Sequence, residues 1–146
     1  MQIRCFRSIL KCAFLLTLVG YIWFILDSTL FGRTDSPEYQ YKTIPFWSYF
    51  AILDGETNLV KEDILNVALF VPIGLFLYCI VAVRKWWIAL VFGFGLSSCI
   101  ELLQLVWKRG TCEFDDVFHN TIGCLIGYFI ARIIIKCCRS NLYVFV

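Results

Sequence analysis

The stretch SSCIELLQLVWKRGTCEFDDVFHNTIGCLIG, residues 97–127, joins two strongly apolar segments across a short polar bend. Polar and ionisable side chains are concentrated there in a chain that is otherwise hydrophobic. A charge placed beside or inside hydrocarbon-facing helices is costly, so such a charge usually has a partner or a function. The polar members of the stretch are Glu101, Gln104, Lys108, Arg109, Glu113, Asp115, Asp116, His119 and Asn120.

The composition predicts an integral membrane protein of the all-α class. Of the 146 residues, 60% are hydrophobic and only 16% are charged, and the mean hydropathy is +0.78. Apolar runs of about twenty residues are long enough to cross a bilayer core of roughly 30 Å. The net charge of +2 and the lack of a basic stripe with interleaved aromatic residues argue against a nucleic-acid partner.

Four apolar segments predict a bundle of four transmembrane helices in a single membrane domain, residues 1–146. The predicted helices cover approximately residues 8–31, 64–83, 86–106 and 117–137. A basic start followed by an apolar run also fits a secretory signal peptide, but no small-residue cleavage site follows, which favours a retained first helix. The two-residue turn Arg84-Lys85 predicts that the second and third helices form an antiparallel hairpin.

The segment TIPFWSYFAIL, residues 43–53, is too short to span a bilayer. Its aromatic residues suit the level of the lipid headgroups, with Pro45 in a first helical turn. Two interpretations stay open: an interfacial or re-entrant segment, or a loop that carries aromatic residues of the membrane interface.

The distribution of basic residues predicts the orientation in the membrane. One side receives the basic residues of the first eleven positions, of the turn at 84–85 and of the end of the last helix. The other side receives fewer basic residues and every acidic residue of the loops. The positive-inside rule therefore predicts a multi-pass protein of the cell membrane with both termini in the cytoplasm.

This orientation places the polar side chains at the outer boundary of the membrane. Glu101 and Gln104 lie in the last turns of the third predicted helix, and they share one helix face. Asp116 and Asn120 begin the fourth helix, and Asn66 begins the second. A short bend brings these helix ends together, so we predict one polar site that faces the outside of the cell.

Structural alternatives exist for several of these residues. Glu101 suits a ligand contact or a proton-handling group, or else a structural pair with Arg109 or Lys108 or a hydrogen bond to Asn120. Arg109 suits either a ligand or the phosphates of ordinary lipids. One of the two aspartates at 115 and 116 fits an N-cap of the fourth helix. His119 has no second metal ligand in the sequence and is interpreted as interfacial packing.

Three linked motifs closely resemble the VanZ-like family. They are NVALFVPIG at 66–74, SSCIELLQL at 97–105 and FDDVFHNTIGCLIGY at 114–128, with IPF at 44–46 before them. The resemblance covers about residues 45–132, and Cys112 and Glu113 depart from the family pattern. The polar positions that match the family are Asn66, Glu101, Gln104, Arg109, Asp116 and Asn120.

The resemblance implies a small bacterial membrane protein whose namesake is linked to glycopeptide resistance of the teicoplanin type. It supplies no chemical mechanism, and family members differ in whether they confer resistance. We expect no cofactor and no metal, since neither cysteine nor histidine spacing fits a metal site. The expected partners are membrane lipids and either a lipid-linked cell-wall precursor or a lipid-tailed glycopeptide; the oligomeric state stays open.

Two alternatives come from other functional classes. No nucleophile motif or phosphate-binding glycine loop supports an enzyme, so we favour a non-enzymatic role. A membrane-embedded enzyme or lipid translocator would use Glu101 and Asp116 as acid and base. A structural subunit would present the small-residue face of Gly123 and Gly127 to a partner.

Overall fold

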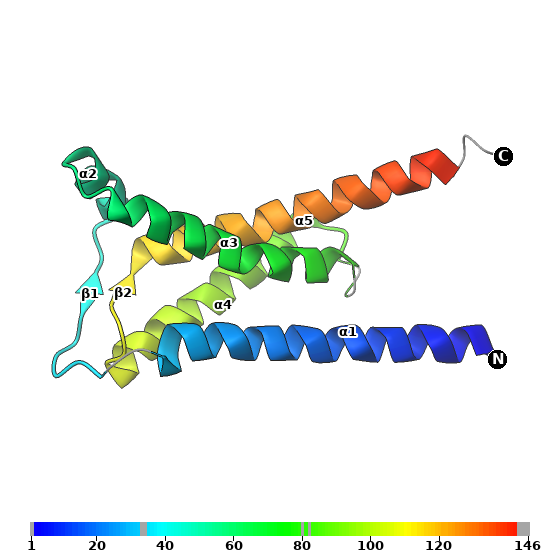
Figure 1. Cartoon of the computed structure of the whole chain (residues 1–146), viewed down its shortest axis with the longest axis horizontal. Coiled ribbons are helices and arrows are strands. Elements are labelled where there is room, and N and C mark those ends of the chain that lie inside the picture. Colours follow the sequence, from blue (N-terminus) through cyan, green and yellow to red (C-terminus); the bar gives the residue numbers. More distant parts are fainter. Residues whose placement is uncertain (1, 33–34, 80, 82, 143–146) are drawn as a thin grey trace.

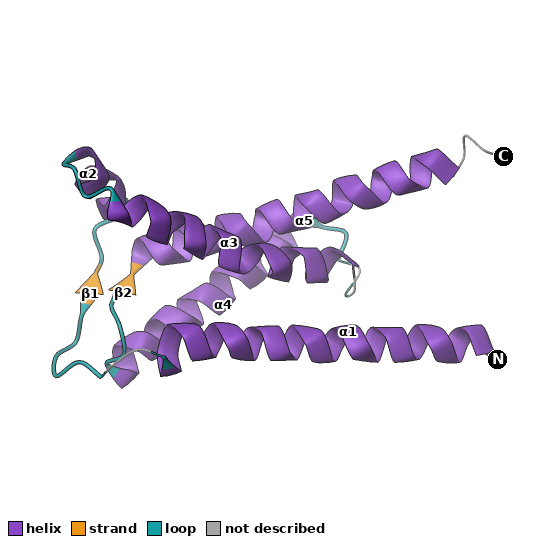
Figure 2. Ribbon diagram, in the orientation of Figure 1, coloured by secondary structure: helices purple, strands orange, loops and turns teal. Residues whose placement is uncertain are grey.

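The computed structural model describes residues 2–32, 35–79, 81 and 83–142. The chain is built from helices and one very short sheet (Figures 1 and 2). Helix α1 continues directly into a π-helical turn, η1. In order, the elements are α1 (Gln2–Leu26), η1 (Asp27–Phe31), β1 (Tyr41–Lys42), α2 (Trp47–Leu53), α3 (Asn58–Cys79), α4 (Trp86–Trp107), β2 (Cys112–Glu113) and α5 (Phe114–Leu142).

Three helices of the described chain are long and apolar enough to cross a membrane. They are α3, α4 and the part of α5 from Phe114 to Cys138, which confirms the second, third and fourth predicted helices as candidate spans. The apolar helical segment Leu15–Phe31, which comprises the end of α1 and η1, is shorter than the roughly 20 residues that a span needs. The all-α class is therefore confirmed, whereas a bundle of four spans is not.

Helices α3 and α5 form the most extensive contact of the molecule because glycine lets their backbones approach. A Cβ atom at Gly123 would overlap the carbonyl oxygen of Val67, and one at Gly127 would overlap that of Val71. Gly74 of α3 meets the backbone of α5 in the same way. The small-residue face of α5 is thus covered by α3 of the same chain, and the expectation that it meets a partner subunit is wrong.

The buried core lies between α3, α4 and α5, with α1 at its side. Tyr128 packs edge-to-face on Tyr78, and the Tyr21 hydroxyl of α1 donates a hydrogen bond to the carbonyl of Leu69 at 2.8 Å. Most of the α1 side chains whose burial the structure describes are exposed, as expected for a surface that faces lipid. The core cluster consists of Ile25, Phe70, Ile73, Leu77, Ala89, Ile100, Cys124 and Tyr128.

Helices α3 and α5 have boundaries that differ from the sequence-based expectation. Helix α3 begins at Asn58 rather than near 64, so Asn66 lies in its third turn and not in its first. Helix α5 begins at Phe114 rather than 117 and continues to Leu142. Two aspartates in the first turn of α5 favour this early start, because negative charge stabilises the N-terminal end of a helix dipole.

The sequence did not predict the parallel pairing of β1 with β2. Tyr41 pairs with Cys112, and Lys42 pairs with Glu113. Asp35 and Arg109 form a further antiparallel bridge between the same two connections. These pairs hold the segment before α2 against the bend between α4 and α5, at the end of the molecule opposite to the start of α1 and the end of α5 (Figure 1).

Candidate functional site

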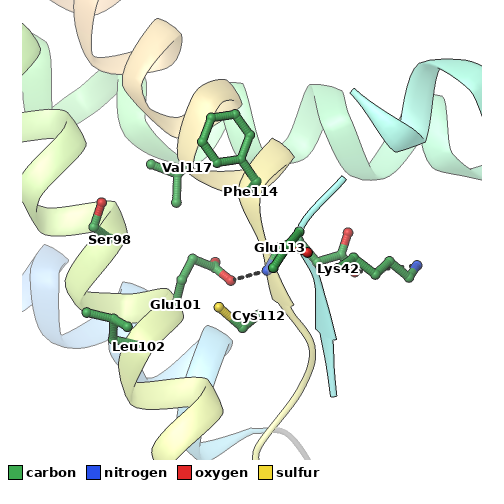
Figure 3. A pocket seen from close by; sticks show the side chains of 9 residues that line it. Lys42, Ser98, Glu101, Leu102, Cys112, Glu113, Phe114 and Val117 are labelled. Atoms are coloured by element: carbon green, nitrogen blue, oxygen red, sulfur yellow. Dashed lines mark hydrogen bonds and ion pairs between the residues drawn. The ribbon is translucent and has the colours of Figure 1, made fainter. Parts of the chain in front are cut away.

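The predicted site residues gather where β2 links α4 to α5, but the structure uses them in different ways. Glu101 is the residue that lines a cavity most directly. Its side chain is only 4% exposed, and its Oε2 accepts a hydrogen bond from the backbone N–H of Glu113 at 2.8 Å. Figure 3 shows this carboxylate reaching from α4 toward β2.

The cavity beside Glu101 has a volume of about 270 Å³. Its walls include Ser98 and Leu102 of α4, Cys112 of β2 and Val117 of α5 (Figure 3). A buried carboxylate in a mostly apolar cavity is the type of group that receives a cation or a hydrogen-bond donor.

Asn66 and Asp116 meet directly, although Asn66 lies in the third turn of α3 and not at the start of the helix, where the sequence placed it. The Asn66 Nδ2 donates a hydrogen bond to Oδ1 of Asp116 at 2.6 Å, which ties α3 to α5. Both side chains line a polar cavity of about 460 Å³, together with Glu62, Thr111 and Glu113. Three of these five side chains are carboxylic acids, so the cavity favours a ligand group that is cationic or rich in hydrogen-bond donors.

Gln104 and Asn120 are buried and form hydrogen bonds within the chain. The Gln104 Nε2 donates to the carbonyl of Thr29 at 3.1 Å, which joins α4 to the π-helical turn after α1. The Asn120 Nδ2 donates to the Ser97 hydroxyl at 2.8 Å, which joins α5 to α4. Both residues thus have a structural contact that explains a polar group at these positions.

Arg109 forms an ion pair with Asp35 on the surface. Its Nε lies 2.6 Å from Oδ1 of Asp35. The neighbouring Lys108 ends α4 in the left-handed conformation, and its Nζ donates to the carbonyl of Pro37 at 3.3 Å. A phosphate or carboxylate of a ligand would therefore compete with Asp35 for the Arg109 guanidinium.

The sequence suggested that one of the two aspartates at 115 and 116 caps the fourth predicted helix. In the structure, Asp115 stabilises the start of α2 instead. Its Oδ1 accepts the backbone N–H of Phe46 at 2.6 Å, and its Oδ2 accepts that of Ser48 at 3.0 Å. These N–H groups lie at the N-terminus of α2, where backbone donors lack helical partners. Pro45 lies just before α2 rather than within its first turn.

Glu113 is a central residue that sequence reasoning missed. Its Oε2 accepts the indole N–H of Trp47 at 3.0 Å, and its Oε1 lies 3.6 Å from the Lys42 ammonium. The same ammonium lies 3.2 Å from the centre of the Trp47 ring. Burial raises the pKa of Glu113, and Lys42 acts in the opposite direction.

Cys112 lies among carboxylates, and its thiol points into the Glu101 cavity (Figure 3). Burial raises the pKa of this thiol, and the negative charges of Glu101, Asp116 and Glu113 raise it further. Both members of the predicted acid–base pair therefore influence the same sulfur atom. At neutral pH the thiol is protonated and weakly nucleophilic.

The sequence suggested only interfacial packing for His119, but in the structure this side chain also has two polar neighbours. It is 3% exposed, and its Nε2 lies 2.9 Å from the Tyr49 hydroxyl. Its Nδ1 lies 3.5 Å from Oδ1 of Asp63. Nothing in the sequence indicated this arrangement, since Tyr49 and Asp63 have no recognisable spacing to His119. Across the described chain, no group of three or more metal-binding side chains is arranged to hold a metal ion.

The fold and the cavities define a class: a small helical protein with several membrane-spanning candidates and buried acidic residues at one end of its bundle. The family is shown by the match of residues 11–135 to the VanZ/LLP1 family model, so the chain belongs to the VanZ/LLP1 family. It is 27% identical over 112 residues to Protein VanZ of Enterococcus faecium, a match that covers 77% of this chain and 66% of that protein. No solved structure matches the chain.

Proposed function

We propose that this chain is a multi-pass protein of the bacterial cell membrane that lowers susceptibility to teicoplanin-type glycopeptides. Its outward-facing site would bind a lipid-tailed glycopeptide or a lipid-linked cell-wall precursor. Family membership supports this role, because the similar protein of Enterococcus faecium carries the name VanZ.

The proposed orientation has four helices across the membrane and both termini in the cytoplasm. It is supported by the basic turn at 84–85, which lies on the same side of the molecule as the start of α1 and the end of α5 (Figure 1). The mixed-charge bend at 108–116 lies at the opposite end. Short loops with an excess of Lys and Arg tend to stay in the cytoplasm.

The observation that carries the proposal is the pair of cavities that both border β2. Glu101 lines one and Asp116 lines the other, with Asn66 and Glu113 beside Asp116. Lys42 is also in the wall of the cavity beside Glu101, whereas the cavity beside Asp116 is lined by three carboxylic acids and suits a ligand's ammonium, amide or hydroxyl donors rather than its phosphates. In this proposal the ligand contacts Glu101, Asp116 and Asn66. The helices are held in place by Gln104 and Asn120. Arg109 releases Asp35 when it binds an anionic group of the ligand.

Antibiotic susceptibility tests the proposal. Glu101→Gln and Asp116→Asn variants are compared with wild type in a strain where the wild-type gene raises teicoplanin resistance. We expect both variants to lose resistance at normal membrane abundance, while Glu56→Gln, in the exposed loop before α3, keeps it. Unchanged resistance in both site variants would refute the proposal.

A membrane-embedded enzyme or lipid translocator is the second candidate. The specific observation in its favour is that Glu101 and Asp116 both act electrostatically on Cys112. Purified protein in liposomes would convert or flip a lipid-linked precursor if this candidate holds, and Glu101→Gln would stop the activity. Binding of the precursor without conversion or flipping would favour the binding role.

A further inference from the structure

A second potential binding place lies outside the cavities described above. A groove of about 540 Å³ lies between α2 and α3, and His119 of α5 also lines it. Aliphatic side chains form most of its wall, among them Ile52, Val60, Val67 and Val71. These α3 residues lie on a different helix face from Glu62 and Asn66, so the groove is separate from the polar cavity.

The polar groups of this groove form a connected set. The Tyr49 hydroxyl lies 2.9 Å from His119 Nε2, and His119 Nδ1 faces the Asp63 carboxylate at 3.5 Å. The partners determine the tautomer: a proton on Nδ1 faces the carboxylate, and Nε2 then accepts from the tyrosine hydroxyl. With the proton on Nε2 instead, the lone pair of Nδ1 would face a negative charge.

The contact between His119 and Asp63 is incomplete. An N–H···O hydrogen bond usually spans 2.7–3.2 Å, and Nδ1 of this 97% buried histidine has no hydrogen-bond partner within the described chain. Because this Nδ1–H lies beyond hydrogen-bond distance of Asp63, the carboxylate keeps acceptor capacity that a donor group of a ligand could use.

The charge of the groove selects the kind of ligand. Asp63 supplies a negative charge, and neither Lys nor Arg is among the described residues that line the groove. Burial, with Asp63 and Asp115, raises the pKa of Tyr49, so the phenol stays neutral and acts as a hydrogen-bonding group. A phosphate or carboxylate would be repelled there, whereas an ammonium group would be attracted.

We propose that this groove binds a cationic single-chain amphiphile. The alkyl chain lies along the aliphatic wall between α2 and α3. The ammonium group pairs with Asp63 and donates a further hydrogen bond to the Tyr49 oxygen. This inference is independent of the proposed role in resistance, because it concerns other residues and another ligand class.

Photo-crosslinking of the full-length protein in phosphatidylcholine nanodiscs tests the proposal. The probes are a dodecylamine with a diazirine in its chain and the corresponding alcohol and carboxylic acid of equal length. Labelled peptides are mapped by mass spectrometry. We expect the amine to label residues 52–71 saturably, with an apparent affinity about tenfold higher than that of the acid, a difference of about 1.4 kcal/mol.

An isosteric variant distinguishes the contribution of the Asp63 charge to binding from the contribution of the apolar wall. Asp63→Asn should remove the preference for the amine but keep labelling by the neutral alcohol, which also shows that the variant is folded. Asp54→Asn, an exposed aspartate at the end of α2, should behave as wild type. Two results would overturn the proposal: equal labelling of all lipid-facing helices, or a preference for the amine that survives Asp63→Asn.

Discussion

The carboxylate of Asp115, in the first turn of α5, accepts a hydrogen bond from the backbone N–H of Ser48 in the first turn of α2 at 3.0 Å. The same carboxylate accepts the N–H of Phe46 at 2.6 Å, a residue in the left-handed conformation with a φ of 62°. A helix of seven residues has little stability of its own. Helix α2, and with it the groove that α2 borders, therefore depends on a side chain that lies 67 residues further along the chain.

Removing this carboxylate should loosen α2 without unfolding the bundle. Asp115→Ala leaves two backbone donors without their acceptor, at an expected cost of about 2 kcal/mol. Hydrogen–deuterium exchange of residues 46–53 in detergent micelles should become faster, while exchange in α3 and α5 stays slow. Asp54→Ala is the matched control and should not alter exchange at 46–50. Unaltered exchange at 46–50 in Asp115→Ala would contradict this assignment.

The Asn66–Asp116 hydrogen bond should contribute to the stability of the α3–α5 contact. A hydrogen bond to a charged group is worth about 1.5–3 kcal/mol, so a double-mutant cycle with Asn66→Ala and Asp116→Ala should give a coupling energy in the lower part of this range. The measurement is reversible unfolding in mixed micelles. A cycle that pairs Asn66→Ala with Arg132→Ala, far along α5, should show no coupling. Additivity in the first cycle would exclude an energetic role for the contact.

Close backbone packing predicts that Gly127 tolerates no side chain. A Cβ atom there would overlap the backbone of α3 at Val71, and backbone cannot yield as a flexible side chain can. Gly127→Ala should lower stability by about 1–3 kcal/mol or reduce the yield of folded protein. Gly95→Ala, in α4, is the control, because a Cβ there meets nothing within 4 Å; alanine should be neutral or favourable in that helix. Equal stability of the two variants would refute this packing.

The long apolar helices could be predicted from sequence because hydropathy and length are sufficient for that purpose. Helices α3 and α4 were found with errors only at their ends, and Asn66 was correctly grouped with Asp116. The first predicted span, residues 8–31, is the exception, since the apolar helical segment that the structure describes there is short.

Contacts between distant segments were not predictable in this way. The two-residue strands β1 and β2 have no recognisable alternation, and their pairing joins positions about seventy residues apart. The roles of Glu113, Tyr49 and Asp63 were not predicted for the same reason, because each side chain contacts a residue that is far away in sequence. The two aspartates at 115 and 116 look equivalent in sequence, but one holds α2 and the other meets Asn66.

Cys112 reports on the charge of the site through its reactivity. Its thiol pKa is raised above the ordinary value of 9.0 by burial and by nearby carboxylates, and only the thiolate is alkylated at a useful rate. Glu101→Gln removes one negative charge, which favours the thiolate and lowers the pKa. Below the pKa, each unit of decrease raises the thiolate fraction about tenfold, so alkylation at pH 8 should accelerate several-fold.

The rate is measured on the peptide that contains Cys112, by mass spectrometry after timed treatment with iodoacetamide, from pH 7 to pH 10. In wild type the rate should still be rising at pH 9, whereas in Glu101→Gln the same rise should begin at lower pH. Glu56→Gln removes a charge of the same type from an exposed loop, and its profile should match wild type. If Glu101→Gln leaves the profile unchanged, the carboxylate of Glu101 does not act on this sulfur.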